Sequence, residues 1–218
     1  MEGLVFQPSG RVLKSSNMLD ETTRIEVRGR LPYVSRGGIK LAHALDYFQI
    51  NVSNMVALDV GASTGGFTDC MLQRGVTHVY AIDVGHGQIH HKIRTDARVT
   101  VVEKCNARYP FTLPKSVDLI TIDVSFISLR LIIPSISTHL KFGKPIIALV
   151  KPQFEAERGE VGRGGIVRNP QIHQKVMANI TEWSIQNGFT IKNNCSSPIT
   201  GDSGNKEFFL YLEKPNVL

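Results

Sequence analysis

Hydrophobic runs without polar alternation recur along most of the chain, and segments with helical spacing lie between them. Continuous apolar runs separated by helices are typical of a parallel sheet that is covered on both faces. The pattern therefore predicts an α/β fold. The predicted strands are Met55–Val60, Val76–Asp83, Val99–Glu103, Val117–Asp123 and Pro145–Lys151, and the clearest helices are Gly66–Arg74, Ser128–Leu140 and Pro170–Asn187.

The last two apolar segments, Phe189–Asn194 and Glu207–Leu212, follow each other without a helix between them. Their connection includes the turn-forming stretch Gly201–Asn205, which contains Gly, Asp, Ser and Asn. A connection of this kind favours an antiparallel pair of strands. We therefore expect a seven-stranded, mostly parallel sheet with an antiparallel strand at one edge.

The first thirty residues differ from the rest because they hold only short strand-like segments and turns. The segments Leu4–Phe6, Arg11–Leu13 and Arg24–Val27 are too short to bury a core of their own. Leu31-Pro32 marks a linker, since proline restricts the residue before it and ends regular structure. This divides the chain into an N-terminal segment over 1–30, a linker over 31–34 and an α/β domain over 35–218.

Composition places the 218 residues among ordinary globular proteins, with 42% hydrophobic and 20% charged residues. Three widely spaced cysteines and the lack of a signal-like N-terminus predict a cytoplasmic protein. No run approaches the roughly 18 apolar residues of a membrane-spanning helix, so we expect no membrane partner. A net charge of +6 is compatible with a nucleic-acid partner, but a solvated basic face explains it equally well.

A glycine-rich turn, Gly61–Phe67, follows the predicted strand that ends at Val60. Such a turn between a strand and a helix lets the backbone approach a ligand at the carboxyl ends of the strands. In the dinucleotide-binding register the middle glycine, which meets the pyrophosphate, would fall on Ser63. The missing glycine argues against a nicotinamide or flavin dinucleotide.

Acidic residues near this turn favour an adenosine-type ligand. Asp83 ends the next strand, where such folds place the acceptor for the ribose hydroxyls. Asp59 suits a ligand that also carries a cationic amino acid, as S-adenosylmethionine does, while Glu103 and Asn106 lie where an adenine edge is expected. Alternatively, Asp59 and Asp83 are capping or turn residues. The predicted cofactor-binding residues are Asp59, Gly61, Ser63, Thr64, Gly65, Gly66, Phe67, Asp83, Glu103, Asn106 and Asp123.

Four further charged residues are expected at the same edge of the sheet. Asp123 and Lys151 follow the fourth and fifth strands, Glu207 begins the antiparallel strand, and Lys40 opens a helix before the first strand. A lysine that is desolvated beside another cation can act as a base, and carboxylates can orient the ammonium groups. A structural network of ion pairs is the alternative, and these residues alone leave both interpretations open.

Five motifs, in order along the chain, resemble the TlyA family of FtsJ-like ribosomal-RNA 2′-O-methyltransferases, whose members are often labelled haemolysins. The motifs are Tyr33–Leu41, Asp59–Phe67, Asp123–Ser128, Leu149–Glu155 and Gly204–Phe209. The resemblance implies a Rossmann-like S-adenosylmethionine methyltransferase fold. It also implies that the family's catalytic Lys-Asp-Lys-Glu tetrad falls on Lys40, Asp123, Lys151 and Glu207. Within this tetrad we expect Lys151 to be the base.

The resemblance further implies that cytidine 2′-hydroxyls in ribosomal RNA or ribosomal subunits are the substrate. Members of the family begin with an RNA-binding module, and residues 1–30 resemble only its second half. The long, glycine- and arginine-containing loop over 153–169 is expected to be a mobile, RNA-contacting flap. His90, His91 and His173 lack the company of further ligand-type residues, so no metal site is expected.

Two other functions stay open at this point. The family label suggests a membrane-active haemolysin, although no amphipathic or transmembrane segment supports one. The second is a non-catalytic RNA-binding or ribosome-assembly factor with a vestigial cofactor fold. The oligomeric state is left open by the sequence.

Overall fold

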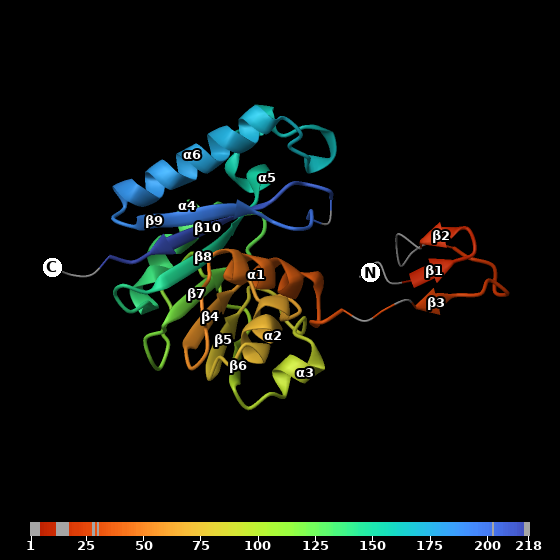
Figure 1. The fold of residues 1–218 in the computed structure, drawn as a ribbon, viewed down its shortest axis with the longest axis horizontal. Coiled ribbons are helices and arrows are strands. Elements are labelled where there is room, and N and C mark those ends of the chain that lie inside the picture. Colours follow the sequence, from red (N-terminus) through yellow and green to blue (C-terminus); the bar gives the residue numbers. More distant parts are fainter. Residues whose placement is uncertain (1–4, 12–17, 28, 30, 202, 216–218) are drawn as a thin grey trace.

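The computed structural model describes residues 5–11, 18–27, 29, 31–201 and 203–215, and it contains the expected α/β domain (Figure 1). Its seven-stranded sheet has the strand order β6-β5-β4-β7-β8-β10-β9, and β4–β8 run parallel to their neighbours of that group. The apolar runs thus form the strands that the sequence predicted. The bounds are β4 Val56–Val60, β5 His78–Ile82, β6 Val99–Val102, β7 Leu119–Ile122, β8 Pro145–Val150, β9 Thr190–Ser196 and β10 Phe208–Glu213.

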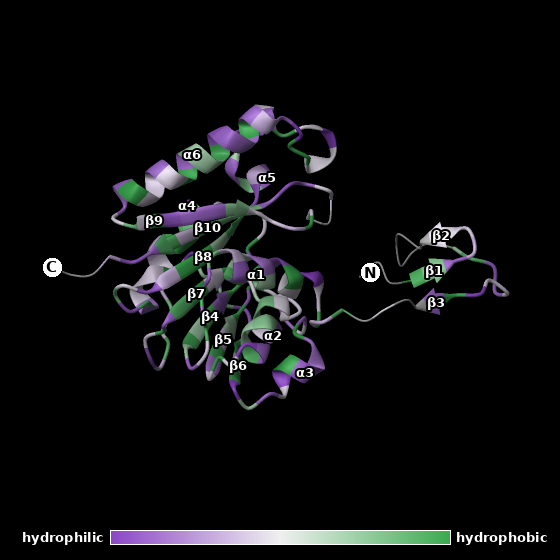
Figure 2. Cartoon of the chain, viewed as in Figure 1, coloured by the Kyte–Doolittle hydropathy of each residue, from purple (hydrophilic) through white to green (hydrophobic). Residues whose placement is uncertain are grey.

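The predicted antiparallel hairpin forms one edge of this sheet. Its second strand, β10, pairs antiparallel with both β8 and β9, so β9 is the outermost strand and β10 lies one place further in. Figure 2 shows β9 as largely hydrophilic, which fits its place at the edge. Phe208 pairs with Val150. Continued by one residue, this register places Glu207 opposite Lys151 at the carboxyl edge of β8.

Helices cover both faces of the sheet, as the unbroken apolar strands predicted. The predicted helix over Ser128–Leu140 ends as an α-helix at Ile136 and continues as the 3-10 turn η1 Ser137–His139. The α-helices are α1 Arg36–Tyr47, α2 Gly66–Gln73, α3 His91–Arg94, α4 Leu129–Ile136, α5 Pro152–Glu155 and α6 Pro170–Gln186. Two further 3-10 turns, η2 Arg158–Glu160 and η3 Arg163–Gly165, lie between α5 and α6.

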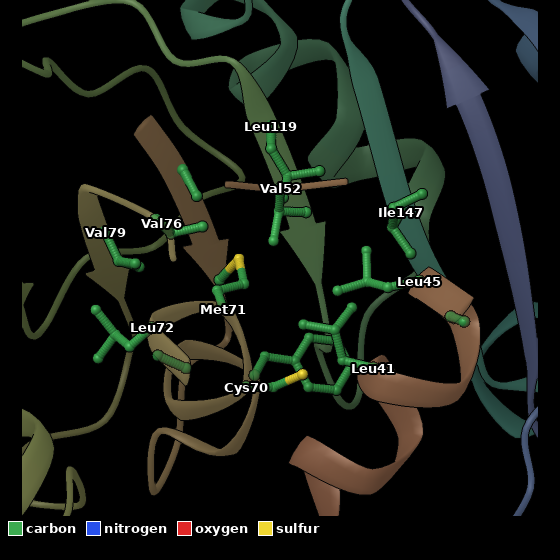
Figure 3. Packing of buried hydrophobic residues seen from close by; sticks show 14 of the residues in the cluster. Leu41, Leu45, Val52, Cys70, Met71, Leu72, Val76, Val79, Leu119 and Ile147 are labelled. Atoms are coloured by element: carbon green, nitrogen blue, oxygen red, sulfur yellow. The ribbon is translucent and has the colours of Figure 1, made fainter. Parts of the chain in front are cut away.

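Each face of the sheet has its own hydrophobic core. One core joins α1 and α2 to the sheet, and Figure 3 shows Leu41 and Leu45 of α1 near Met71 of α2 and Ile147 of β8. The other core packs α4 and α6 against the opposite face, and Trp183 is a half-buried member at its margin. The strands are therefore held from both sides, which fixes the positions of the loops at their carboxyl ends.

The N-terminal segment forms a small sheet of its own (Figure 1). Its strands are β1 Val5–Gln7, β2 Gly10–Arg11 and β3 Glu26–Val27, paired antiparallel in the order β2-β1-β3. Leu4, Val12 and Leu13, which the sequence placed in these strands, lie outside the described residues. Among the helices that the structure describes, none combines the length and apolar character needed to cross a bilayer.

Candidate active site

The glycine-rich turn joins β4 to α2 and packs against the carboxyl ends of the neighbouring strands β5 and β7. Gly61 has a φ of +80°, and a Cβ on it would lie 2.5 Å from the backbone oxygen of Asp123. The amides of Gly61 and Ala62 both donate to the carbonyl of Ile82 on β5. A side chain at position 61 would therefore both strain the backbone and separate β4 from β7. Glycine here keeps the loop close to the ends of three strands.

The first cavity, of about 440 Å³, lies at the carboxyl ends of β4, β5 and β7. Ile82, Ala107 and Ile132 give it apolar walls. Asp83 stands at its rim, where one carboxylate oxygen accepts from the Ser63 amide at 2.7 Å and the other from the Gly85 amide at 2.7 Å. These two hydrogen bonds hold Asp83 in place. Because each oxygen has a further lone pair, the carboxylate can still accept hydrogen bonds from a ligand.

The second cavity, of about 630 Å³, contains all four members of the predicted tetrad in its lining. Lys40 Nζ and Glu207 Oε2 form an ion pair of 2.6 Å, and both side chains are buried. Lys151 Nζ lies 2.7 Å from Asp123 Oδ1 and donates to Ser125 Oγ at 2.9 Å. The structure therefore brings the four residues together as two ion pairs in one cavity.

The fold explains how residues so distant in sequence meet. Asp123 and Lys151 follow the neighbouring parallel strands β7 and β8, whose carboxyl ends lie at one edge. Glu207 precedes the antiparallel β10 and so reaches the same edge from the other direction. Lys40 lies in the second turn of α1, which starts at Arg36. Gly201 leaves room for Glu207, since a Cβ there would lie 2.5 Å from Glu207 Oε1.

The two cavities share part of their walls. Gly61, Ser63, Asp123, Ser125 and Phe126 line both. The side chain of Phe126 is unusual, because the residue is 91% exposed and has a φ of +64°. Its ring centroid lies 5.0 Å from that of Phe154, which lines the second cavity. A solvent-exposed aromatic side chain thus lies where the two cavities meet. Sequence reasoning did not single out Phe126, although it lies within one of the quoted motifs.

A methyltransferase family profile provides the decisive comparison. The profile of the FtsJ-like methyltransferases matches residues 33–214, which include both cavities and the seven strands. The chain belongs to the FtsJ-like methyltransferase family. The match begins beyond the small N-terminal sheet, so the family resemblance concerns the α/β domain.

Several relatives match this methyltransferase over most of their length. "Putative rRNA methyltransferase YqxC" of Bacillus subtilis is 47% identical, and the match covers 99% of this chain and 78% of the relative. "16S/23S rRNA (cytidine-2'-O)-methyltransferase TlyA" of Mycobacterium tuberculosis is 41% identical over 92% of this chain and 76% of its own. A solved structure, "Putative hemolysin from Streptococcus thermophilus", superposes with a TM-score of 0.85 at 46% identity, covering 98% of this chain and 80% of that one. The resemblance to the TlyA family is thereby confirmed.

Most of the predicted cofactor-binding residues of this methyltransferase line a cavity. Of that set, Gly61, Ser63, Asp83, Asn106 and Asp123 line the first cavity, and Thr64, Gly66 and Phe67 line the second. Three others line neither cavity: Asp59, Gly65 and Glu103.

Asp59 lies inside the domain, where it is fully buried in β4. One of its carboxylate oxygens accepts from Thr68 Oγ1 of α2 at 2.6 Å, and the other accepts from Thr121 Oγ1 of β7 at 2.9 Å. Burial raises the pKa of Asp59 to about 6. Its side chain therefore connects the strand before the glycine turn to the helix after it and to β7, and it lines neither cavity.

Glu103 is engaged outside the cavities. Its carboxylate pairs with Arg94 and with His86 Nδ1, the latter at 2.7 Å, and accepts from the Gly87 amide at 2.8 Å. The hydrogen bond from Arg94 is the largest cause that lowers the pKa of Glu103. Gly65 faces Ile93 of α3 and has a φ of +94°. Alternation along a strand and local turns decide these orientations, and a motif match does not reveal them.

Proposed function

We propose that this methyltransferase transfers a methyl group from S-adenosylmethionine to the 2′-hydroxyl of a cytidine ribose in ribosomal RNA. One observation carries the proposal: two lysine–carboxylate pairs line a single cavity that shares a wall with a nucleoside-sized cavity. The similarity to the Mycobacterium tuberculosis relative, a 16S/23S rRNA (cytidine-2'-O)-methyltransferase, supports the choice of acceptor.

The first cavity fits the cofactor in its chemistry. The apolar side chains of Ile82 and Ala107 suit the faces of an adenine, and Asp83 is placed to accept from ribose hydroxyls. Asn106 offers an amide for the edge of the base. Gly61, where a Cβ would meet the backbone of Asp123, lets the loop lie against the end of β7 at the wall of this cavity. When bound, S-adenosylmethionine supplies an electrophilic methyl group on a sulfonium sulfur.

The second cavity would hold the acceptor ribose. A hydroxyl is a weak nucleophile, and positioning together with removal of its proton raises its reactivity. In the proposed step Nζ of Lys151 would take the hydroxyl proton, while the oxygen would accept the methyl group as the bond between that methyl carbon and the cofactor's sulfur breaks. Asp123 and Ser125 hold Nζ in place for this transfer. Lys40, oriented by Glu207, would place a positive charge beside the oxygen.

RNA contacts would come from outside the two cavities. The exposed ring of Phe126 offers a surface on which an unstacked base can lie. We assign residues 1–30 an auxiliary part in RNA binding, following the resemblance to half of the family's N-terminal module. Ribosomal RNA as substrate also makes the cytoplasm the proposed location of the protein.

The replacement of Lys151 by alanine tests this proposal. Lys151→Ala is expected to abolish transfer of labelled methyl groups to unmodified ribosomal subunits, while calorimetry shows S-adenosylmethionine binding close to that of the wild type. The matched control is Lys141→Ala, which removes a Lys–Asp pair of 2.8 Å between Lys141 and Asp118, residues that line neither cavity. Full transfer activity in Lys151→Ala would overturn the catalytic assignment. A wild-type protein that binds RNA but transfers nothing would favour the non-catalytic alternative.

A further inference from the structure

The loop between α5 and α6 carries positive charge at its surface. Residues 157–168, here called the arginine loop, contain η2 and η3 and expose Arg158, Arg163 and Arg168. On its outer side Lys175 of α6 pairs with Glu157 at 3.1 Å and with Glu160 at 2.7 Å. Lys175 and Glu157 are exposed and Glu160 is partly exposed, so solvent screens these pairs and they hold the loop weakly.

A buried side chain holds the same loop from the inside. Asn205 is 2% exposed, and its Oδ1 accepts from the amide of Val167 at 2.9 Å. Its Nδ2 donates to the carbonyl of Gly165 at 2.9 Å. A side-chain amide offers one acceptor and two donors, so it satisfies both backbone groups, whereas a carboxylate can only accept. Leaving either of these groups without a partner costs about 1–3 kcal/mol where it is buried.

Asn205 also shapes the turn that presents Glu207. Its backbone oxygen accepts from the amide of Gly201 at 2.9 Å, and Gly201 packs directly against the Glu207 carboxylate. Only Lys206 separates Asn205 from Glu207. Any shift of Asn205 therefore displaces the carboxylate that pairs with Lys40 in the second cavity.

We propose that Asn205 is a positioning residue that couples the arginine loop to the Lys40–Glu207 pair. The loop's exposed arginines fit the phosphodiester backbone of an RNA strand next to the acceptor nucleotide. Binding of phosphates then restrains the loop, and the Asn205 amide passes this restraint to Glu207. The RNA part of this inference rests on the proposed function, whereas the anchoring of the loop by Asn205 does not.

The test exchanges a single group of the side chain. Asn205→Asp keeps the acceptor for Val167 but replaces the Nδ2 donor with an oxygen that faces the Gly165 carbonyl. Asn187→Asp is the matched control, because Asn187 Nδ2 donates to the Trp183 carbonyl at 2.8 Å at the end of α6, and Asn187 lines neither cavity. If Asn205→Asp does not fold, as judged by circular dichroism, Asn205→Ser carries the same test, since its short side chain cannot reach both backbone groups.

Two readouts are needed. Trypsin cleavage after Arg163, followed by mass spectrometry without RNA, is expected to accelerate about tenfold or more in Asn205→Asp and to stay unchanged in Asn187→Asp. In methyl transfer, kcat is expected to fall and KM for the RNA to rise in Asn205→Asp. The dissociation constant of S-adenosylmethionine is expected to stay within about twofold, because Asn205 does not line the first cavity.

A double-mutant comparison separates coupling from simple loosening. Arg163→Ala is expected to raise KM for RNA in the wild-type background and to add little in the Asn205→Asp background, because the loop is then already uncoupled. Fully additive effects, or faster cleavage of the loop with unchanged kinetics, would overturn the coupling. Unchanged cleavage would overturn the anchoring. If the wild type transfers no methyl group, the proposed function fails, and the trypsin comparison still decides whether Asn205 anchors the loop.

Discussion

Lys40 and Glu207 lie 167 residues apart in the chain, yet their side chains form a buried ion pair of 2.6 Å in the second cavity. Removal of two charges from water is costly, and well-packed apolar residues often serve stability as well or better. The pair is therefore a weak source of stability by itself, which agrees with the proposal that Glu207 orients the ammonium group of Lys40.

This ion pair predicts that replacing both residues restores the stability lost in a single variant but does not restore activity. Glu207→Leu leaves Lys40 buried without its partner and is expected to destabilise the protein by about 3–5 kcal/mol. The double variant Lys40→Met/Glu207→Leu is expected to recover most of this loss and to stay inactive. Urea denaturation and methyl-transfer assays on the three proteins check this. Transfer activity in the double variant would remove the pair from the catalytic machinery.

The exposed ring of Phe126 predicts a defect in RNA binding without a defect in stability. Phe126→Ala is expected to change the free energy of unfolding by less than about 0.5 kcal/mol, since the side chain is solvent-exposed. Loss of base stacking is expected to raise KM for RNA by roughly tenfold, because stacking contributes about 1–3 kcal/mol per base.

Phe142→Ala serves as the control for this change. Phe142 is also an exposed aromatic residue, but it packs against Lys214 Nζ and lines neither cavity. Equal kinetics for the Phe126 and Phe142 variants would contradict the stacking role.

Asp59 predicts a dependence of stability on pH. Burial raises its pKa from 3.8 to about 6, so the folded protein binds a proton that the unfolded chain has lost in this range. The stability from this group is fully present below about pH 3.8 and is lost as the pH rises through about 6. A shift of roughly two pH units corresponds to about 3 kcal/mol.

Comparison with Asp59→Asn isolates this effect, because asparagine does not ionise. Relative to that variant, the wild type is expected to lose stability mainly between about pH 4 and about pH 6, with the midpoint about halfway between the two pKa values. Denaturant unfolding at a series of pH values measures the difference. A difference that does not vary with pH would show that Asp59 ionises as freely in the folded protein as in the unfolded chain.

The hydrogen bonds of Glu155 connect the segment after β8 to the start of α4, and we predict that this connection matters for both stability and activity. Its Oε2 accepts from Ser128 Oγ and its Oε1 from the Leu129 amide, both at 2.7 Å, so it joins the segment after Lys151 to the start of α4. Burial raises the pKa of the Glu155 carboxyl. Glu155→Ala is expected to destabilise the protein by about 1–3 kcal/mol and to slow methyl transfer, since the segments bearing Lys151 and Ser125 separate.

Glu155→Gln is the informative comparison. Its amide can accept from Leu129 and donate to Ser128, so it is expected to restore most of the stability and activity. Thermal unfolding and transfer rates of both variants are the measurements. A glutamine variant as damaged as the alanine variant would show that the negative charge, rather than the bridge between the segments, is what matters.

Much of the domain could be predicted from the chain. Apolar runs mark buried strands whether or not their partners are known, because a strand covered on both faces needs apolar residues at every position. Once the strands were predicted, the positions of Asp123 and Lys151 followed, because residues after neighbouring parallel strands lie at the same edge of the sheet. The glycine turn after Val60 also has a local signature.

Other features depend on contacts that only the folded chain makes. Sequence spacing marked the hairpin, but the insertion of β10 between β8 and β9 follows from its pairing on both sides. Asp59 and Glu103 were predicted to bind the cofactor, yet Asp59 accepts hydrogen bonds from two buried threonines and Glu103 pairs with surface cations. Nothing local distinguishes an exposed Phe126 from a core phenylalanine.

The sequence by itself thus determined the strands, the glycine turn and the edge of the sheet at which the two cavities lie, because these follow from local periodicity and chain direction. Only the tertiary structure decided which polar side chains line a cavity and which pair with other protein groups away from it. The reason is physical: burial and pairing depend on neighbours that are distant in sequence, as Asn205 shows by satisfying the backbone of a loop some 40 residues away.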